Sequence, residues 1–152
     1  MKKHMGSKVI LNAYLQALEK HQYQCPYDIE RAINYIHTHC FDEKLNINLL
    51  KEVCKINRKC FSARFKRFTT RYPKEYILHH RIEAGKILLK ETDESITLVA
   101  IELGFRSNSS FCKAFSNEAA LSPSEWRRKN KSLGFFQNKF QDLIQAKENI
   151  AI

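Results

Sequence analysis

Apolar residues recur at intervals of three and four along most of the chain, the spacing that places them on one face of a helix. The spacing is clearest between Ser95 and Arg127, where a first apolar face consists of Ile96, Val99, Ala100 and Leu103. Gly104 follows at once, where a helix ends and glycine turns most easily into the left-handed region. Ser107 can then cap a second helix, whose buried side is marked by Phe111 and Phe115. This order is typical of a helix-turn-helix unit.

The same pattern occurs fifty residues earlier. At this displacement and without a gap, the first copy supplies Val53, Asn57, Phe61, Phe65, Pro73, Glu75 and Tyr76, which match Leu103, Ser107, Phe111, Phe115, Pro123, Glu125 and Trp126. A repeat with caps, aromatics and prolines in register predicts two helix-turn-helix units in tandem. We expect the first unit over about residues 41–72, a long linker helix over 73–91 that begins at Pro73, and the second unit over 92–131.

Two further amphipathic segments flank this domain, which we place at residues 25–131. Residues 1–24 form a predicted helical extension whose apolar stripe is Val9, Ile10, Ala13, Tyr14, Ala17 and Leu18. We expect it to dock on the domain, with a dimer contact as the alternative. Residues 132–152 form a predicted C-terminal helical tail with Phe136, Phe140, Leu143 and Ile144 on its apolar side. The predicted fold class is therefore all-α.

Composition narrows the class of partner. Lys and Arg number 26 against 16 Asp and Glu, which gives a net charge of +10 and suits a polyanion, nucleic acid before an anionic membrane. No apolar run is long enough to span a membrane. The five cysteines are widely spaced, without a CxxC pair, which favours free thiols in a reducing cytoplasm. His37, His39 and Cys40 lack a second cluster that would complete a metal site, and no catalytic motif is present, so we expect no cofactor, no metal and no enzyme activity.

The motif IxxxAxxxGFxSxxxFxxxF, read from Ile96 to Phe115, and the later SPSEWR from Ser122 to Arg127 resemble the AraC family of bacterial transcription regulators. The resemblance covers about Tyr27 to Lys129. It implies seven helices in two helix-turn-helix subdomains, each inserting one recognition helix into the DNA major groove, and activation through RNA polymerase as a possible partner. The chain departs from the family pattern where Lys55 and Ala120 replace glycine, where Ser116 replaces lysine, and where Ala63 and Arg64 exchange polar and apolar character.

The candidate site residues lie on the two predicted recognition helices, the first of which we expect to begin at Asn57. Short or forked polar side chains read base edges, and the expected base contacts are Lys59, Ser62, Lys66, Asn108, Ser109, Cys112 and Lys113. Cations, caps and helix N-termini hold phosphates, and the expected phosphate contacts are Asn57, Arg58, Arg67, Arg106, Ser107 and Arg127.

Together these features predict a sequence-specific double-stranded DNA-binding regulator of transcription, of the activator type, cytoplasmic and nucleoid-associated. The alternatives are a non-specific architectural DNA binder and a partner-binding protein that keeps the fold. The roughly 24 residues before the domain are too few for a sensor domain, so the chain is either a short stand-alone regulator or a fragment. The oligomeric state stays open.

Overall fold

The computed structural model describes residues 6–57 and 59–131, and these residues form eight helices without a strand. The helices are α1 (Ser7–Glu19), α2 (Tyr27–His39), α3 (Ile47–Val53), α4 (Phe61–Thr69), α5 (Pro73–Glu91), α6 (Ile96–Glu102), α7 (Asn108–Ala119) and α8 (Pro123–Asn130). The all-α prediction is confirmed, as is the linker helix that starts at Pro73. The predicted C-terminal helix over 132–152 lies outside the described residues.

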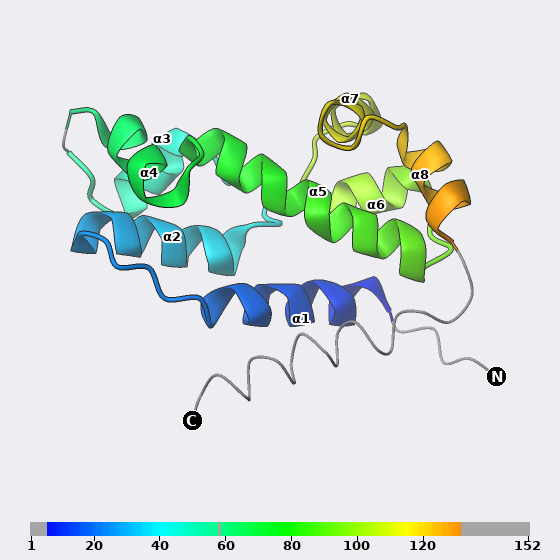
Figure 1. Ribbon diagram of the computed structural model, residues 1–152, viewed down its shortest axis with the longest axis horizontal. Coiled ribbons are helices and arrows are strands. Elements are labelled where there is room, and N and C mark those ends of the chain that lie inside the picture. Colours follow the sequence, from blue (N-terminus) through cyan, green and yellow to red (C-terminus); the bar gives the residue numbers. More distant parts are fainter. Residues whose placement is uncertain (1–5, 58, 132–152) are drawn as a thin grey trace.

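Helix α5 passes between two hydrophobic cores and contributes to both (Figure 1). The first core joins α2, α3 and α4 around Phe61 and Phe65, and the second joins α6 and α7 around Phe111 and Phe115. All four phenylalanines are fully buried. Within each pair the rings meet edge to face, with centroids 5.7 Å apart in the first unit and 5.6 Å in the second. The two units therefore repeat the same internal packing on either end of one helix.

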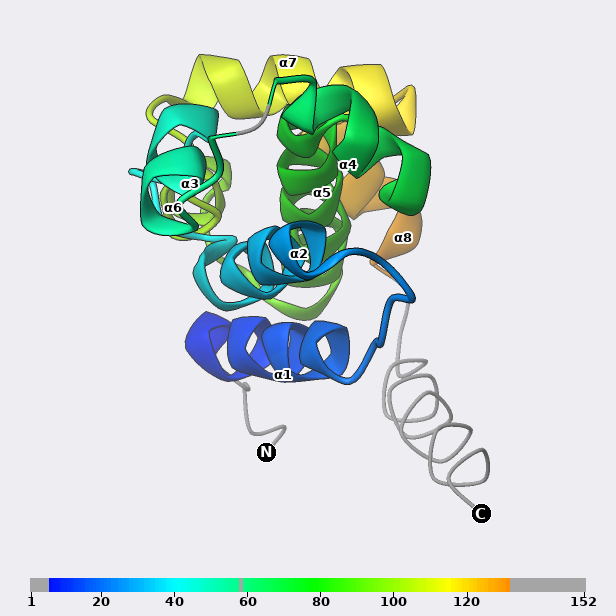
Figure 2. The same ribbon diagram turned by 90° about the vertical axis from the view of Figure 1, so that its left-hand side faces the viewer.

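The recognition helices α4 and α7 lie on the side of the molecule turned away from α1, as Figures 1 and 2 show from perpendicular directions. Helix α1 packs on α2 and α5. Its predicted apolar stripe is only partly correct, because Val9 is exposed while Leu11, which we left out of the stripe, is buried. None of the described helices is long and apolar enough to cross a membrane.

The turns of the two units are alike but not in the register that the sequence repeat predicts. The caps Asn46 and Ser95 each accept a hydrogen bond from the backbone N–H three residues later, and they are 49 residues apart, as are the helices that follow them. The left-handed residue of the turn is Lys55 (φ +50°) in the first unit and Gly104 (φ +81°) in the second, again 49 apart. The phenylalanines of α4 and α7 are 50 apart. The gap-free alignment is therefore wrong by one residue within the turn.

The shorter turn changes where the first recognition helix begins. Five positions separate buried Ile56 from Phe61, whereas six separate the corresponding Phe105 from Phe111. In the second unit this spacing leaves room for Ser107 to cap α7 by accepting from the N–H of Ser110 at 3.1 Å. In the first unit α4 begins only at Phe61, after left-handed Cys60 (φ +65°), which makes no side-chain cap. The prediction that Asn57 starts the recognition helix is wrong.

Arg81, in the middle of α5, holds the two units together. Its buried guanidinium donates from Nε to Cys40 O (2.8 Å), from Nη2 to Asp42 O (2.7 Å) and from Nη1 to Gly104 O (3.0 Å). The first two carbonyls belong to the segment between α2 and α3, and the third belongs to the turn of the second unit. Because one rigid fork bonds to both units, it fixes their relative position.

Candidate nucleic-acid interface

Helix α7 presents a continuous polar face opposite its buried phenylalanines. Asn108, Ser109 and Lys113 are exposed and Cys112 is half-buried. Their spacing of one, four and five positions places them on one side of a helix. The Cys112 thiol donates to Asn108 Oδ1 at 3.5 Å, so these two side chains support each other on the surface. The structure therefore brings together all four base-contact candidates of the second unit.

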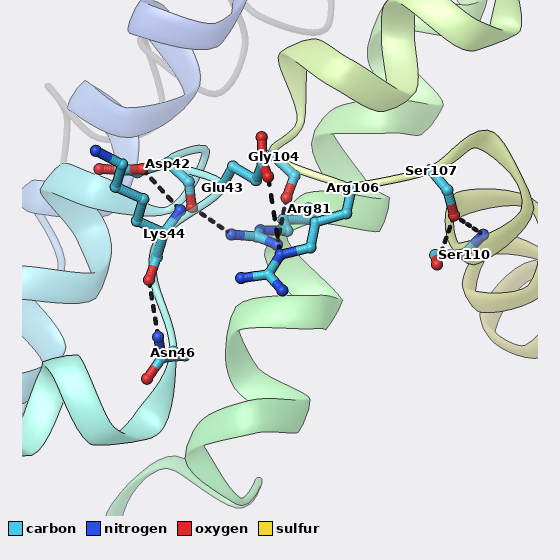
Figure 3. Close-up of polar contacts among 9 residues, drawn as sticks. All are labelled: Asp42, Glu43, Lys44, Asn46, Arg81, Gly104, Arg106, Ser107 and Ser110. Carbon is cyan, nitrogen blue, oxygen red and sulfur yellow. Dashed lines mark hydrogen bonds and ion pairs between the residues drawn. The ribbon is translucent and has the colours of Figure 1, made fainter.

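The N-terminus of α7 carries the features of an anion site. Ser107 occupies the cap, and the hydroxyls of Ser107 and Ser110 are 2.8 Å apart (Figure 3). Arg106 precedes the cap and is exposed over 77% of its side chain, with its Nε 3.8 Å from Oε1 of Glu43. An exposed ion pair of this length contributes little, so exchanging Glu43 for a phosphate is inexpensive. Two of the three predicted phosphate contacts of this unit, Arg106 and Ser107, are thus accessible at a helix N-terminus.

In the first unit, fewer of the predicted DNA-contact residues lie together on the recognition helix. Ser62 and Lys66 lie one turn apart on α4, half-buried and exposed respectively, and Arg67 is exposed beside them. The Lys66 ammonium sits 4.3 Å from the ring centroid of Tyr72. Lys59 is exposed but lies in the turn before α4, not on the helix as we expected.

Two other predicted phosphate contacts of the first unit have no place on α4. Asn57 is exposed and belongs to the same turn as Lys59. Arg58 lies outside the described residues.

Arg127 has a different task from the one that we predicted. Its Nε donates to Leu89 O at 3.1 Å and its Nη2 to Glu94 O at 2.5 Å. These carbonyls lie at the C-terminal end of α5 and in the connection to α6, where helix carbonyls lack intrahelical partners. Arg127 therefore anchors α8 to the end of the linker helix, a contact that the sequence did not predict.

The exchanged pair Ala63 and Arg64 is explained by a contact with α2. Arg64 Nη1 and Nη2 donate to the two carboxylate oxygens of Asp28, at 2.6 and 3.0 Å. This bidentate pair raises the pKa of Arg64 and ties α4 to the first turn of α2. Ala63 is left exposed, without a polar group for a base.

Two residues that matter for the interface were not predicted from the sequence. Asn117 lies one turn beyond Lys113, is exposed, and extends the polar face of α7. Arg81 was missed as the residue that fixes both units. Its signal was present, since a charged residue interrupts the apolar spacing of the long helix between Ile77 and Leu88, both of which are buried.

The described residues contain no group of three or more His, Cys, Asp or Glu side chains that could hold a metal ion. His37 from the HxHC run is buried, with Nε2 2.7 Å from the hydroxyl of Tyr76. Burial lowers the pKa of His37 to about 4, so the ring is neutral near pH 7. His37 therefore has a structural role in the core, where its ring is hydrogen-bonded to Tyr76. Of the two cysteines near the first turn, Cys54 is buried and Cys60 is exposed.

Sequence comparisons agree on one family. A family model described as "Helix-turn-helix domain" matches residues 51–129, just over half of the chain. The HTH-type transcriptional regulator YobQ of Bacillus subtilis (strain 168) is 34% identical over 112 residues, which cover 74% of this chain and 43% of YobQ. The melibiose operon regulatory protein of Escherichia coli (strain K12) is 35% identical over 88 residues, or 58% of this chain and 29% of that protein. The chain thus spans less than half the length of these relatives.

Solved structures give the same fold. The C-terminal domain of AraT, a response regulator from Geobacillus stearothermophilus, matches with a TM-score of 0.69 and 21% identity over 74% of this chain and 93% of that domain. The DNA-binding domain of AdpA, solved in complex with a target DNA, matches with a TM-score of 0.62 and 22% identity over 67% of this chain and 91% of that domain. With its two helix-turn-helix units and the family match over residues 51–129, the chain belongs to the AraC-type helix-turn-helix family of DNA-binding transcription regulators, which is not a family of enzymes.

Proposed function

We propose that this chain binds double-stranded DNA sequence-specifically by inserting α4 and α7 into two adjacent segments of the major groove. One observation carries the proposal: the two recognition helices lie on the same side of α5, and Arg81 bonds to both units at once (Figures 1 and 3). The 19-residue α5 is roughly 28 Å long at 1.5 Å per residue. Adjacent major-groove segments on one face of DNA are about 34 Å apart.

The second unit supplies most of the base readout in this proposal. Asn108 can bond adenine bidentately, Lys113 can donate to guanine, and Cys112 lies where a thymine methyl group could be contacted. Ser109 allows close approach of the backbone to the base edges. The first unit reads with Ser62 and Lys66, and Lys59 reaches the DNA from the turn in front of α4.

Phosphates are held mainly at the N-termini of the two recognition helices. In the second unit Arg106 and Ser107 take this role together with the free backbone N–H groups of α7. In the first unit Asn57, Arg58 and Arg67 are the proposed contacts. These groups position the protein and add affinity that is independent of base sequence.

Activation of transcription through a contact with RNA polymerase is the proposed outcome of binding, in the cytoplasm and in association with the nucleoid. Control by a ligand belongs to this proposal only if the chain is joined to a sensor domain.

The decisive experiment is selection of binding sites from random duplexes at near-physiological salt, followed by titration of the best site and a scrambled site. We expect a selected motif in two adjacent major-groove segments. Enrichment in one segment alone would reduce the first unit to a positioning role. An absence of enrichment would favour an architectural DNA binder, and an absence of DNA binding would favour a partner-binding protein.

Two variants separate base contacts from phosphate contacts. Lys113→Ala should relax base preference in one half of the site and cost roughly 1–3 kcal/mol there. Arg106→Ala should weaken binding to all sequences by a similar factor and flatten the salt dependence of binding. Glu43→Ala is the matched control, because it removes the ion-pair partner of Arg106 without removing a cation. An unchanged selected motif with Lys113→Ala would contradict the assignment of this face.

A further inference from the structure

We propose that residues 7–25, which comprise α1 and the connection to α2, act as a strut that fixes the angle between the two helix-turn-helix units and so sets the spacing of the DNA site. The effect on DNA rests on the proposed function above. The strut itself is a property of the free protein and can be tested without DNA.

The apolar contacts of this segment reach both hydrophobic cores. Ile10 and Leu11 belong to the core of the second unit, and Ile10 is only 2% exposed. Tyr23 and Cys25 pack against the core of the first unit. Apart from α5, the segment is therefore a second physical connection between the units, on the side away from α4 and α7 (Figures 1 and 2).

At the N-terminal end of the segment, a hydroxyl joins the strut to the second unit. Ser7 is buried, and its Oγ lies 2.8 Å from Oε1 of Glu94 and 2.7 Å from Oε1 of Glu102. A hydroxyl has one hydrogen and can donate to one carboxylate only, so a proton on one of the two carboxyls completes the cluster. In agreement, burial and the neighbouring Glu94 raise the pKa of Glu102. Since Glu94 precedes α6 and Glu102 is its last residue, this contact holds both ends of the helix.

In the middle and at the C-terminal end, two tyrosines join the strut to α5. The Tyr14 hydroxyl lies 2.9 Å from Nδ1 of His80, and the Tyr23 hydroxyl lies 3.0 Å from that of Tyr76. The Tyr76 hydroxyl is also 2.7 Å from Nε2 of buried His37 in α2. Tyr14, Tyr23 and His80 are half-buried and Tyr76 and His37 are buried, so breaking these contacts leaves polar atoms with restricted access to water as a replacement partner.

The three contacts are spread along the segment and touch the second unit, the middle of α5 and the first unit in turn. Loss of these contacts would leave the hydrogen bonds of Arg81 to hold the two units, so the range of angles between the units would widen while the internal packing of each unit stays intact. The recognition helices would keep their faces but lose their fixed separation.

The test uses the full chain with the triple variant Ser7→Ala, Tyr14→Phe and Tyr23→Phe, which removes the polar contacts and keeps the apolar ones. The matched control is Asn12→Ala with Gln16→Ala, on the exposed side of the same helix. Spin labels on non-natural residues at positions 63 and 117, exposed on α4 and α7, report the distance between the units by pulsed dipolar spectroscopy. We expect one narrow distance distribution for the parent and the control, and a broader or shifted distribution for the triple variant.

The second readout is the affinity for the selected site against the same site with one base pair inserted between its halves. The triple variant should lose roughly tenfold in this discrimination, with the affinity for each half-site alone unchanged. An unchanged distance distribution overturns the strut, even if DNA binding is specific. If the parent shows no site preference, the proposed function fails while the distance measurement still decides on the strut. Should the triple variant not fold, Tyr14→Phe alone with the same labels decides.

Discussion

The carbonyl oxygen of Gly104 accepts a hydrogen bond from Nη1 of Arg81 at 3.0 Å, and this contact joins the turn of the second unit to the linker helix. The same guanidinium bonds to Cys40 O and, as Figure 3 shows, to Asp42 O of the first unit. No carboxylate is among these three acceptors, and burial lowers the pKa of Arg81, so the cation is stabilised by carbonyl dipoles.

Arg81→Met should lower the free energy of unfolding by about 3 kcal/mol, because three carbonyl groups lose a charged donor and two of them, those of Cys40 and Gly104, are in buried hydrogen bonds. Urea denaturation followed by circular dichroism measures this change. Arg128→Met, at an exposed position of α8, is the control and should stay within about 0.5 kcal/mol of the parent. Equal stability of the two variants would remove Arg81 from its role between the units.

Gly104→Ala and Lys55→Gly should change stability in opposite directions. A Cβ on Gly104 would lie 2.7 Å from Phe41 O at a φ of +81°, so the alanine variant should lose about 2 kcal/mol. Lys55 already holds φ at +50° with a side chain, and glycine there should add about 0.5 kcal/mol after its larger unfolded-state entropy is subtracted. Gly6→Ala, which meets no atom within 4 Å, is the neutral control for thermal denaturation. A gain in stability from Gly104→Ala would contradict the geometry of the turn.

The N-termini of the two recognition helices differ. We therefore expect that Ser107 stabilises the fold as a helix cap and that Asn57, its counterpart in the repeat, does not. Ser107→Ala should cost about 1 kcal/mol, because the hydroxyl accepts from Ser110 N. Asn57→Ala should change stability by less than about 0.5 kcal/mol, since α4 begins only at Phe61. Chemical denaturation of the two variants in parallel distinguishes the shorter turn from a shared cap; similar losses would restore Asn57 as a cap.

Stability should fall as the pH is lowered from about 6.5 toward 4. Burial lowers the pKa of His80 to about 3, with His79 adding to the effect, and lowers that of His37 to about 4. Above pH 6.5 the rings of His80 and His37 are neutral in both the folded and the unfolded chain. Below pH 6.5 these rings bind protons in the unfolded chain but stay neutral in the folded chain. Each histidine therefore removes about 1.4 kcal/mol per pH unit in this range. Glu102, whose pKa is raised in the folded state, acts in the opposite sense at the acidic end.

The measurement is the free energy of unfolding between pH 7.5 and 5 for the parent, His80→Gln and His37→Gln. Each variant should reduce the slope of the unfolding free energy against pH by the amount that corresponds to about one proton, which is about 1.4 kcal/mol per pH unit. A slope identical to that of the parent would show that the ring titrates normally in the folded chain.

Much of the fold could be predicted from periodicity, because Val99, Ala100 and Leu103 at the first helix of the second unit and the phenylalanines of α4 and α7 were expected on buried faces and are buried. Proline and capping chemistry located the starts of α5, at Pro73, and of α7, after Ser107. The alignment of the two repeats was wrong at the first turn, which is one residue shorter than the second. Neither composition nor hydropathy indicates this deletion.

Long-range pairs of polar groups were the other failure. Arg127 resembles a surface cation in sequence, yet its acceptors are carbonyls 33 and 38 positions away. The pairing of Arg64 with Asp28 depends in the same way on how the helices fold together. Side-chain type predicts which group can bond, and only tertiary packing selects the partner.

The one-residue difference between the two turns adds to the asymmetry of the chain, whose two recognition helices already carry different base-contact candidates. Here α7 has a capped, polar N-terminus, whereas α4 lacks that first turn and starts from left-handed Cys60. Under the proposed function, a single chain distinguishes upstream from downstream, so reversing its site would turn the protein end for end relative to a promoter.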